Sequence, residues 1–263
     1  MAASLILRNV SWALSTLLEL VLLFFLVRRR FYRSHPAFCL YVIVAILQSA
    51  VVAASYMSFG TDSRQSYDVG WGSQAMVIAV RWGAIMEISR KTFADYSGIG
   101  AMVSRILLGL AACVLVYSIA SAKTKWELVV LNADRSTELG IATFIVALFV
   151  FVRYYRVPMP DLERLLAIGF CLYSCFAVLN DSIYENWRRA AGNLWDYLDL
   201  LTFTATLLLW ISAVRSYSEI PVATSPATLS PEDYGELSQK LNSRLYLLNH
   251  RLNRLFRSED PRP

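Results

Sequence analysis

The chain alternates long apolar runs with short polar or charged breaks. An α-helix needs roughly 20 mostly apolar residues to cross the hydrocarbon core of a bilayer, and most of the runs approach that length. The runs lie at about 11–27, 37–58, 72–92, 99–121, 138–155, 163–185 and 196–217. The pattern predicts an all-α membrane protein with a seven-transmembrane-helix bundle over residues 1–217, a linker over 218–229 and a tail over 230–263.

Composition and charge distribution set the environment and the orientation. Of the 263 residues, 56% are hydrophobic, too many for a soluble domain with a wetted surface. Arginines follow the odd-numbered segments, as at Arg28, Arg29 and Arg153. The positive-inside rule then predicts a multi-pass membrane protein with its N-terminus outside and its C-terminus in the cytoplasm. The formal net charge of +5 is attributed to this topology and to anionic lipid at the cytoplasmic face, with no role for nucleic acid.

The residues needed by several common membrane enzymes and receptors are missing. The two histidines, His35 and His250, lie at or beyond the predicted cytoplasmic boundary, so a histidine-based zinc site at membrane depth is disfavoured. The last apolar run has no lysine for a retinal Schiff base, and no Gly-rich phosphate loop is present. We therefore expect no catalytic residues, no metal ligands and no cofactor.

Two charges lie near the middle of apolar runs. Arg81 lies in the third run and Glu19 in the first, at similar predicted depth. Because a charge in hydrocarbon costs about 2.5 to 3.5 kcal/mol on insertion scales, both side chains should face the interior and pair. We predict that Arg81 is held by a carboxylate of another helix, with Glu19 as the partner and Gln48 as an additional hydrogen-bond partner. Trp82, beside Arg81, is expected to line a cavity.

A third charged group lies near the cytoplasmic end of the same run. Glu87 precedes Arg90 by three residues and Lys91 by four. Side chains at these spacings are neighbours on one helix face, so the sequence predicts a local ion pair.

Further polar residues lie near the outer ends of the fifth, sixth and seventh runs. If these helices are neighbours, their side chains form a polar pocket in the outer half of the bundle. The alternative is that Glu138, Asp181 and Asp196 only cap or flank helix ends at the wet interface. The candidate residues here are Arg135, Glu138, Asn180, Asp181 and Asp199.

Two functions are compatible with this pattern. An offset of 125 residues places Arg28 on Arg153, as in a transporter with a three-plus-one-plus-three helix plan. However, the inner halves of several runs are apolar, which argues against a continuous polar path. The sequence therefore favours a membrane sensor or scaffold with an outer polar pocket, with a small-solute transporter as the alternative.

The tail has its own pattern. Ser230 and Pro231 are suited to begin a helix, and apolar residues then recur at spacings of three and four through residue 255. The pattern predicts an amphipathic or coiled-coil helix over 230–257. It can bind anionic lipid, pair with a second copy of the chain, or bind a cytoplasmic protein.

A family resemblance agrees with this fold. The sequence has "LLEL" with Glu19 in the first run, "EISR" ending with Arg90 in the third, an Arg-Ser pair at Arg135 and "RYY" beginning at Arg153. These residues, together with Glu87, resemble uncharacterised seven-helix inner-membrane proteins of the type found in acidobacterial genomes. The resemblance covers residues 10–217 and implies a bacterial inner-membrane protein, but no mechanism.

Overall fold

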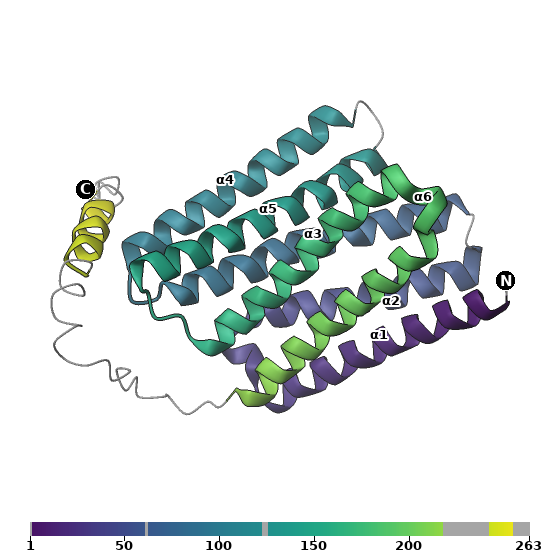
Figure 1. Cartoon of the computed structure of the whole chain (residues 1–263), viewed down its shortest axis with the longest axis horizontal. Coiled ribbons are helices and arrows are strands. Elements are labelled where there is room, and N and C mark those ends of the chain that lie inside the picture. Colours follow the sequence, from purple (N-terminus) through teal and green to yellow (C-terminus); the bar gives the residue numbers. More distant parts are fainter. Residues whose placement is uncertain (1, 61–62, 123–125, 218–241, 255–263) are drawn as a thin grey trace, which may run out of the picture.

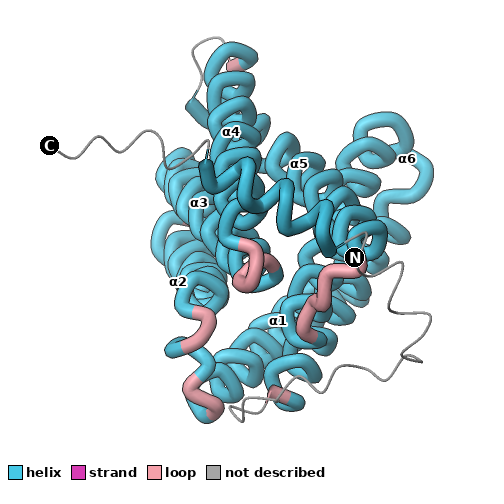
Figure 2. The backbone as a smooth tube through the Cα atoms, turned by 90° about the vertical axis from the view of Figure 1, so that its left-hand side faces the viewer, coloured by secondary structure: helices cyan, strands magenta, loops and turns pink. Residues whose placement is uncertain are grey.

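The computed structural model describes residues 2–60, 63–122, 126–217 and 242–254, and these residues form helices and no strands. The helices pack side by side along the long axis of the molecule (Figure 1). Seen along that axis, α4 lies at the edge of the bundle, next to α3 and α5 (Figure 2). The elements are α1 (Ala2–Arg28), η1 (Phe31–Arg33), α2 (Pro36–Phe59), α3 (Arg64–Thr92), α4 (Ser97–Ser121), α5 (Trp126–Tyr155) and α6 (Asp161–Ser216).

The helix α6 turns back on itself. It runs to one end of the bundle, reverses, and returns (Figure 1). The Trp210 indole N–H donates a hydrogen bond of 3.2 Å to the Leu166 carbonyl, 44 residues away, although a straight helix would separate those residues by about 66 Å. We call residues 161–179 the outgoing limb and residues 201–216 the returning limb. The two limbs correspond to the sixth and seventh predicted segments.

The helices α1, α3 and α5 all begin earlier than the hydrophobic pattern predicts, and α1 already begins at Ala2. The helix α3 begins at Arg64 and α5 at Trp126, whereas the apolar runs begin near residues 72 and 138. An apolar run covers only the part of a helix that lies in hydrocarbon. The helix itself extends beyond the run until a helix-breaking residue such as glycine or proline ends it. No glycine or proline occurs between Trp126 and Leu139. As a result Glu138, predicted near the start of its helix, lies 12 residues inside α5.

The end of α2 and the start of α3 are joined by hydrogen bonds. Gly60 ends α2 with a φ of 82°, a backbone conformation that favours glycine. The Ser63 hydroxyl then caps α3 by accepting a hydrogen bond of 3.1 Å from the Ser66 N–H. The Ser66 hydroxyl in turn donates to the Ser55 carbonyl on α2. These bonds hold the ends of α2 and α3 side by side.

The surface of the bundle is apolar. Met57 is 88% exposed, and Val116 and Leu201 are each 66% exposed. Exposing apolar surface to water costs about 25 cal/mol of free energy per Å², whereas contact with lipid tails does not carry that cost. Within the described residues, four helical segments are long and apolar enough to cross a bilayer, namely Pro36–Phe59, Gly98–Ser121, Trp126–Tyr155 and Asp161–Leu179. The fold is therefore that of a multi-pass helical membrane protein in contact with lipid.

One end of the bundle carries most of the helix-terminal arginines. Arg28 ends α1, Arg90 lies in the last turn of α3, Arg153 in that of α5 and Arg215 in that of α6. We call this the basic end, and the other the opposite end. Because α1 and the returning limb both finish there, these two segments run parallel.

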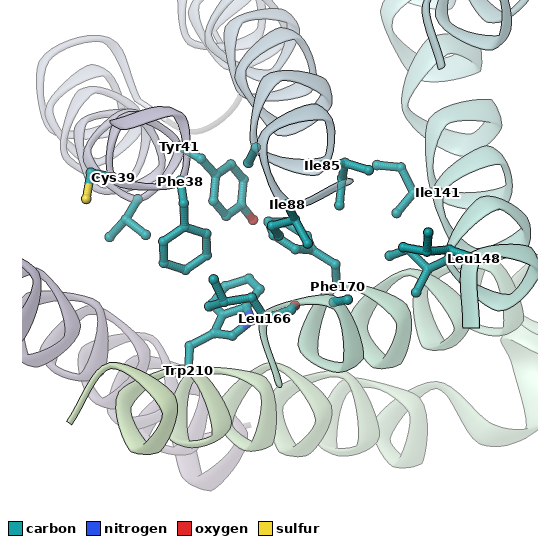
Figure 3. Packing of buried hydrophobic residues seen from close by; sticks show 14 of the residues in the cluster. Phe38, Cys39, Tyr41, Ile85, Ile88, Ile141, Leu148, Leu166, Phe170 and Trp210 are labelled. Atoms are coloured by element: carbon teal, nitrogen blue, oxygen red, sulfur yellow. Dashed lines mark hydrogen bonds between the residues drawn. The ribbon is translucent and has the colours of Figure 1, made fainter. Parts of the chain in front are cut away.

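An aromatic cluster closes the interior between the middle of the bundle and the basic end. Phe38 and Tyr41 point from α2 toward Phe170 and Trp210 on the two limbs of α6 (Figure 3). The ring centroids of Phe170 and Trp210 are 4.8 Å apart, and those of Phe38 and Trp210 are 5.3 Å apart. A Cβ at Gly169 would collide with the Trp210 indole, so glycine is needed for this close approach.

The tail contains a helix that packs against the bundle. Residues 242–254 are helical, whereas the predicted start at Ser230 lies outside the described residues. The Asn249 amide oxygen accepts a hydrogen bond of 2.6 Å from the Gly98 N–H in the first turn of α4. A Cβ at Gly98 would lie within 2.6 Å of Asn249. The tail helix therefore packs on the start of α4 at a place where glycine leaves room for it.

Candidate functional site

The centre of the bundle holds a buried ion pair. The Arg81 Nη1 of α3 donates to the Glu138 Oε1 of α5, and the exposed fractions of the two side chains are 3% and 6%. The Ser174 hydroxyl, on the outgoing limb of α6, donates to the other oxygen of Glu138 at 2.5 Å. Three helices are thus joined through one carboxylate.

The prediction that Arg81 faces the interior and meets a carboxylate of another helix is confirmed, but the predicted partner, Glu19, is wrong. Arg81 pairs with Glu138. The reason is helix order: α3 packs against α5, whereas α1 packs against α2 and α6. Similar depth along two helices does not make those helices neighbours.

Other polar side chains extend the ion pair toward the opposite end. Asp134, one turn before Glu138 on α5, lies 3.8 Å from Arg81 and accepts a 3.0 Å hydrogen bond from Gln74. Gln48 of α2 donates to Gln74 at 2.6 Å. Gln48 therefore reaches Arg81 through two intermediates and not directly. We call Gln48, Gln74, Arg81, Asp134, Glu138 and Ser174 the buried polar network.

The network is not equally buried along its length. The Asp134 side chain is 29% exposed, and Gln48 and Gln74 are half-buried. Arg81, Glu138 and Ser174 are buried. The network is therefore most accessible near Gln48, Gln74 and Asp134 and ends in a fully enclosed guanidinium.

Aromatic side chains enclose the guanidinium. The Arg81 Cζ lies 5.3 Å from the centroid of the Tyr173 ring and 5.9 Å from that of Tyr41, distances typical of cation–π contacts. The Trp82 indole N–H, next along α3, donates a 3.2 Å hydrogen bond to Thr137 of α5. The rings thus join α3 to α2 and α6 at the guanidinium, and the Trp82 bond joins α3 to α5 beside the ion pair.

The other residues predicted for the outer pocket are either exposed or have side chains outside the described part of the chain. Arg135 lies on α5 next to Asp134, but its side chain is exposed. The side chains of Asn180, Asp181 and Asp199 lie outside the described part of the chain. For Glu138 the alternative of a residue flanking a helix end is wrong, because it lies well inside α5. Glu138 is thus the predicted outer-pocket residue that the described side chains place in the network.

The predicted local ion pair of Glu87 with Arg90 and Lys91 is not formed. The Glu87 Oε2 accepts a 3.0 Å hydrogen bond from the Phe38 N–H in the first turn of α2. The first N–H groups of a helix have no partner within the helix, and the helix dipole favours a negative charge there. Glu87 thus caps a neighbouring helix. Arg90 is exposed, and the Lys91 Nζ lies 3.4 Å from the His35 Nδ1.

At the basic end, the structure contains a cluster around His35 that the sequence did not predict. His35 is buried, and its Nε2 lies 3.2 Å from the Glu163 Oε1 in the first turn of α6. Its ring stacks on Phe31 at a centroid distance of 4.4 Å. The Ser34 hydroxyl lies 2.5 Å from the His35 Nδ1 and accepts from Tyr217, which follows α6. The cluster joins the α1–α2 connection to both ends of α6.

Glu19 is buried on the inner face of α1, near Leu22 and Leu26 in sequence. Its Oε2 is buried and has no hydrogen-bond partner among the described residues. A buried polar atom without a partner costs about 1 to 3 kcal/mol. This oxygen of Glu19 therefore gains no hydrogen bond on folding, in contrast to Glu138, whose two oxygens are both bonded.

Replacing Glu19 by leucine should thus leave the free energy of unfolding unchanged or raise it by up to about 1 to 3 kcal/mol, since it removes an unpartnered buried oxygen. Glu19→Gln serves as the matched control, because it keeps a buried polar group and should give no gain. Unfolding in detergent micelles measures both. A loss of stability in Glu19→Leu together with full stability in Glu19→Gln would show that the side chain makes a favourable polar contact.

The network offers hydrogen-bonding groups but no recognisable catalytic or metal centre. Among the described residues, no group of three histidine, cysteine, aspartate or glutamate side chains is placed to hold a metal ion. The Arg81 Nε has no hydrogen-bond partner and is a spare donor. At the accessible side, Gln74 and Asp134 present amide and carboxylate groups. The arrangement is suited to hydrogen bonding with a small polar molecule.

The chain was compared with protein families, curated proteins and solved structures. No protein-family model, curated protein or solved structure matches this chain.

Proposed function

We propose that the protein is a membrane sensor or scaffold in which the buried polar network receives a small polar ligand near Gln48, Gln74 and Asp134. The proposal rests on the unequal burial of the network at its two ends. It is half-buried at Asp134 and fully enclosed at Arg81. The aromatic cluster then fills the interior on the side of the basic end (Figure 3). A closed interior favours sensing over the transport alternative.

The Arg81 ion pair supplies a switching element for this proposal. Two carboxylates compete for one guanidinium: Glu138 is in direct contact and Asp134 lies 3.8 Å away. A ligand that binds Asp134 or Gln74 changes that competition. Because Glu138 also holds Ser174, a change at Arg81 is passed to α6. A ligand shifts such an equilibrium only as far as it binds one arrangement better than the other.

The tail helix is the proposed output. Its docking on Gly98 supports a role in relaying a change in the bundle, since α3 leads directly into α4. We further propose that the helices cross a bacterial inner membrane seven times, with α6 crossing twice, and that the basic end faces the cytoplasm. The arginines at the ends of α1, α3 and α5 support this orientation. The tail would then be free to contact lipid, a second copy or another protein.

A ligand screen coupled to a distance measurement tests the proposal. Amino acids, carboxylic acids and sugars are screened for a rise in melting temperature of the wild type that is lost in Gln74→Leu. Cysteines placed at the exposed Asp95 and Arg251 carry spin labels, with Cys113, Cys171 and Cys175 replaced by serine. A stabilising compound should change the distance between the labels, and Gly98→Val should release the tail as a positive control.

Two outcomes contradict the proposal. Uptake of a stabilising compound into proteoliposomes would assign the network to transport. A stabilising compound that leaves the distance between residues 95 and 251 unchanged would remove the tail from the mechanism.

A further inference from the structure

The basic end contains a cavity that the buried polar network does not use. It has a volume of about 510 Å³ and is lined by Phe25, Arg28, Arg29 and Arg215. Its walls are the last turn of α1 and the last turn of the returning limb of α6. Volumes between about 300 and 1,000 Å³ are typical of sites for small molecules.

The geometry of the cavity is fixed by a bond between its walls. The Arg29 Nη2 donates a 3.1 Å hydrogen bond to the Arg215 carbonyl oxygen. That oxygen lies in the last turn of α6, where carbonyl groups have no partner within the helix. The Arg28 Cζ lies 5.9 Å from the centroid of the Phe24 ring. One arginine thus ties the two helices together, and a second is supported by an aromatic ring.

The charge balance in the cavity is positive. Three guanidinium groups contribute +3, and the two helix C-termini contribute about −0.5 each, which leaves about +2. None of the ion pairs among the described residues involves Arg28, Arg29 or Arg215. Guanidinium groups bind phosphate oxygens with strong, directed hydrogen bonds. An anion carrying phosphate is the ligand that this charge and donor set favour.

The position of the cavity suggests where such a phosphate comes from. Phe24 is more than half exposed, and within one turn α1 changes from this apolar surface to Arg28 and Arg29. Such a change marks the level at which hydrocarbon gives way to lipid headgroups. Basic pockets between transmembrane helices at that level are known to bind anionic headgroups.

We propose that this cavity is a phosphate-binding site that takes the headgroup of an anionic phospholipid and thereby fixes α1 to the returning limb of α6. Phe25 contacts the part of the lipid nearest the acyl chains, and the guanidinium groups of Arg28 and Arg215 bind the phosphate. Arg29 contributes its charge while it keeps the two helices together.

The full-length protein, purified in a neutral detergent, is titrated with phosphatidylglycerol and with phosphatidylcholine while bound lipid is counted by native mass spectrometry. The test variant is Arg28→Gln with Arg215→Gln, which leaves the Arg29 bond in place. The control is Arg33→Gln with Arg153→Gln. It removes the same charge from the same end, and both residues are exposed and lie outside the cavity lining. The control therefore subtracts the general attraction of basic residues for anionic lipid.

Loss of two charge-assisted contacts should weaken phosphatidylglycerol binding about tenfold or more in the cavity variant, with a change below about twofold in the control. Phosphatidylcholine should bind both variants equally. Equal loss in the two variants would overturn the site. A parallel titration with inorganic phosphate distinguishes the sources: stabilisation of the wild type by free phosphate, with no preference for phosphatidylglycerol, would keep the phosphate site and overturn its assignment to lipid.

Discussion

Replacing Arg81 by methionine should lower the free energy of unfolding by about 3 to 5 kcal/mol, because it leaves the Glu138 carboxylate buried without its counter-ion. Glu138→Leu should cost less than Arg81→Met, since Asp134 lies 3.8 Å from Arg81 and can take over part of the pairing. Combining Glu138→Leu with Asp134→Asn should restore the full cost. Reversible unfolding in mixed micelles measures each variant.

The double variant Arg81→Met with Glu138→Leu gives the decisive comparison. It replaces both charges by apolar side chains of similar size, so it should recover most of the loss. The exposed pair Arg164 and Asp161 is the control, with a distance of 2.7 Å and side chains that are 54% and 81% exposed. Its removal should cost at most about 1 kcal/mol. Additive losses for Arg81 and Glu138 would mean that the two side chains do not interact.

The depth of a charge could be predicted from the sequence, whereas its partner could not. The position of Arg81 within an apolar run required an inward orientation and a carboxylate from another helix. The choice between Glu19 and Glu138 depends on which helices pack together. Hydrophobic runs of similar length carry almost no information on that order, because most of their outer surface faces lipid in any arrangement.

The predicted start of the fifth helix was a second source of error, although the sequence contains a signal for the true start. Asp134 was not among the predicted residues, although its neighbour Arg135 was, and the fifth apolar run was taken to begin near residue 138. Asp134 and Glu138 are four residues apart and so lie on one helix face. The absence of glycine and proline back to Trp126 allows that face to continue. Extending the predicted helix back to Trp126 would have placed Asp134 on the same face as Glu138.

The histidine cluster shows a different limit of sequence reasoning. His35, in the connection between α1 and α2, and Glu163, in the first turn of α6, are 128 residues apart in sequence. His35 was expected at or beyond the cytoplasmic boundary, where a polar side chain has water as a partner. Its burial accompanies the packing of Phe31, in η1, against Tyr217, which follows α6. Local patterns do not encode such a contact between distant segments.

The largest effect expected away from the ion pair concerns Trp210. Trp210→Ala should lower the free energy of unfolding by about 3 to 5 kcal/mol, because it removes a buried ring from the aromatic cluster and leaves a cavity. It also removes the hydrogen bond to the Leu166 carbonyl that joins the two limbs of α6. Phe24→Ala is the control: this ring is 56% exposed on the lipid-facing surface, and its loss should cost far less.

Gly169 tests whether the limbs of α6 pack as described. Gly169→Ala alone should destabilise the protein, because the added Cβ collides with the Trp210 indole. In the background of Trp210→Ala the same methyl group enters the space vacated by the ring, so it should cost little or even recover stability. A double-mutant cycle of unfolding free energies measures this coupling. Independent effects of the two substitutions would mean that Trp210 does not lie against Gly169, and that α6 does not fold back over the outgoing limb at this level.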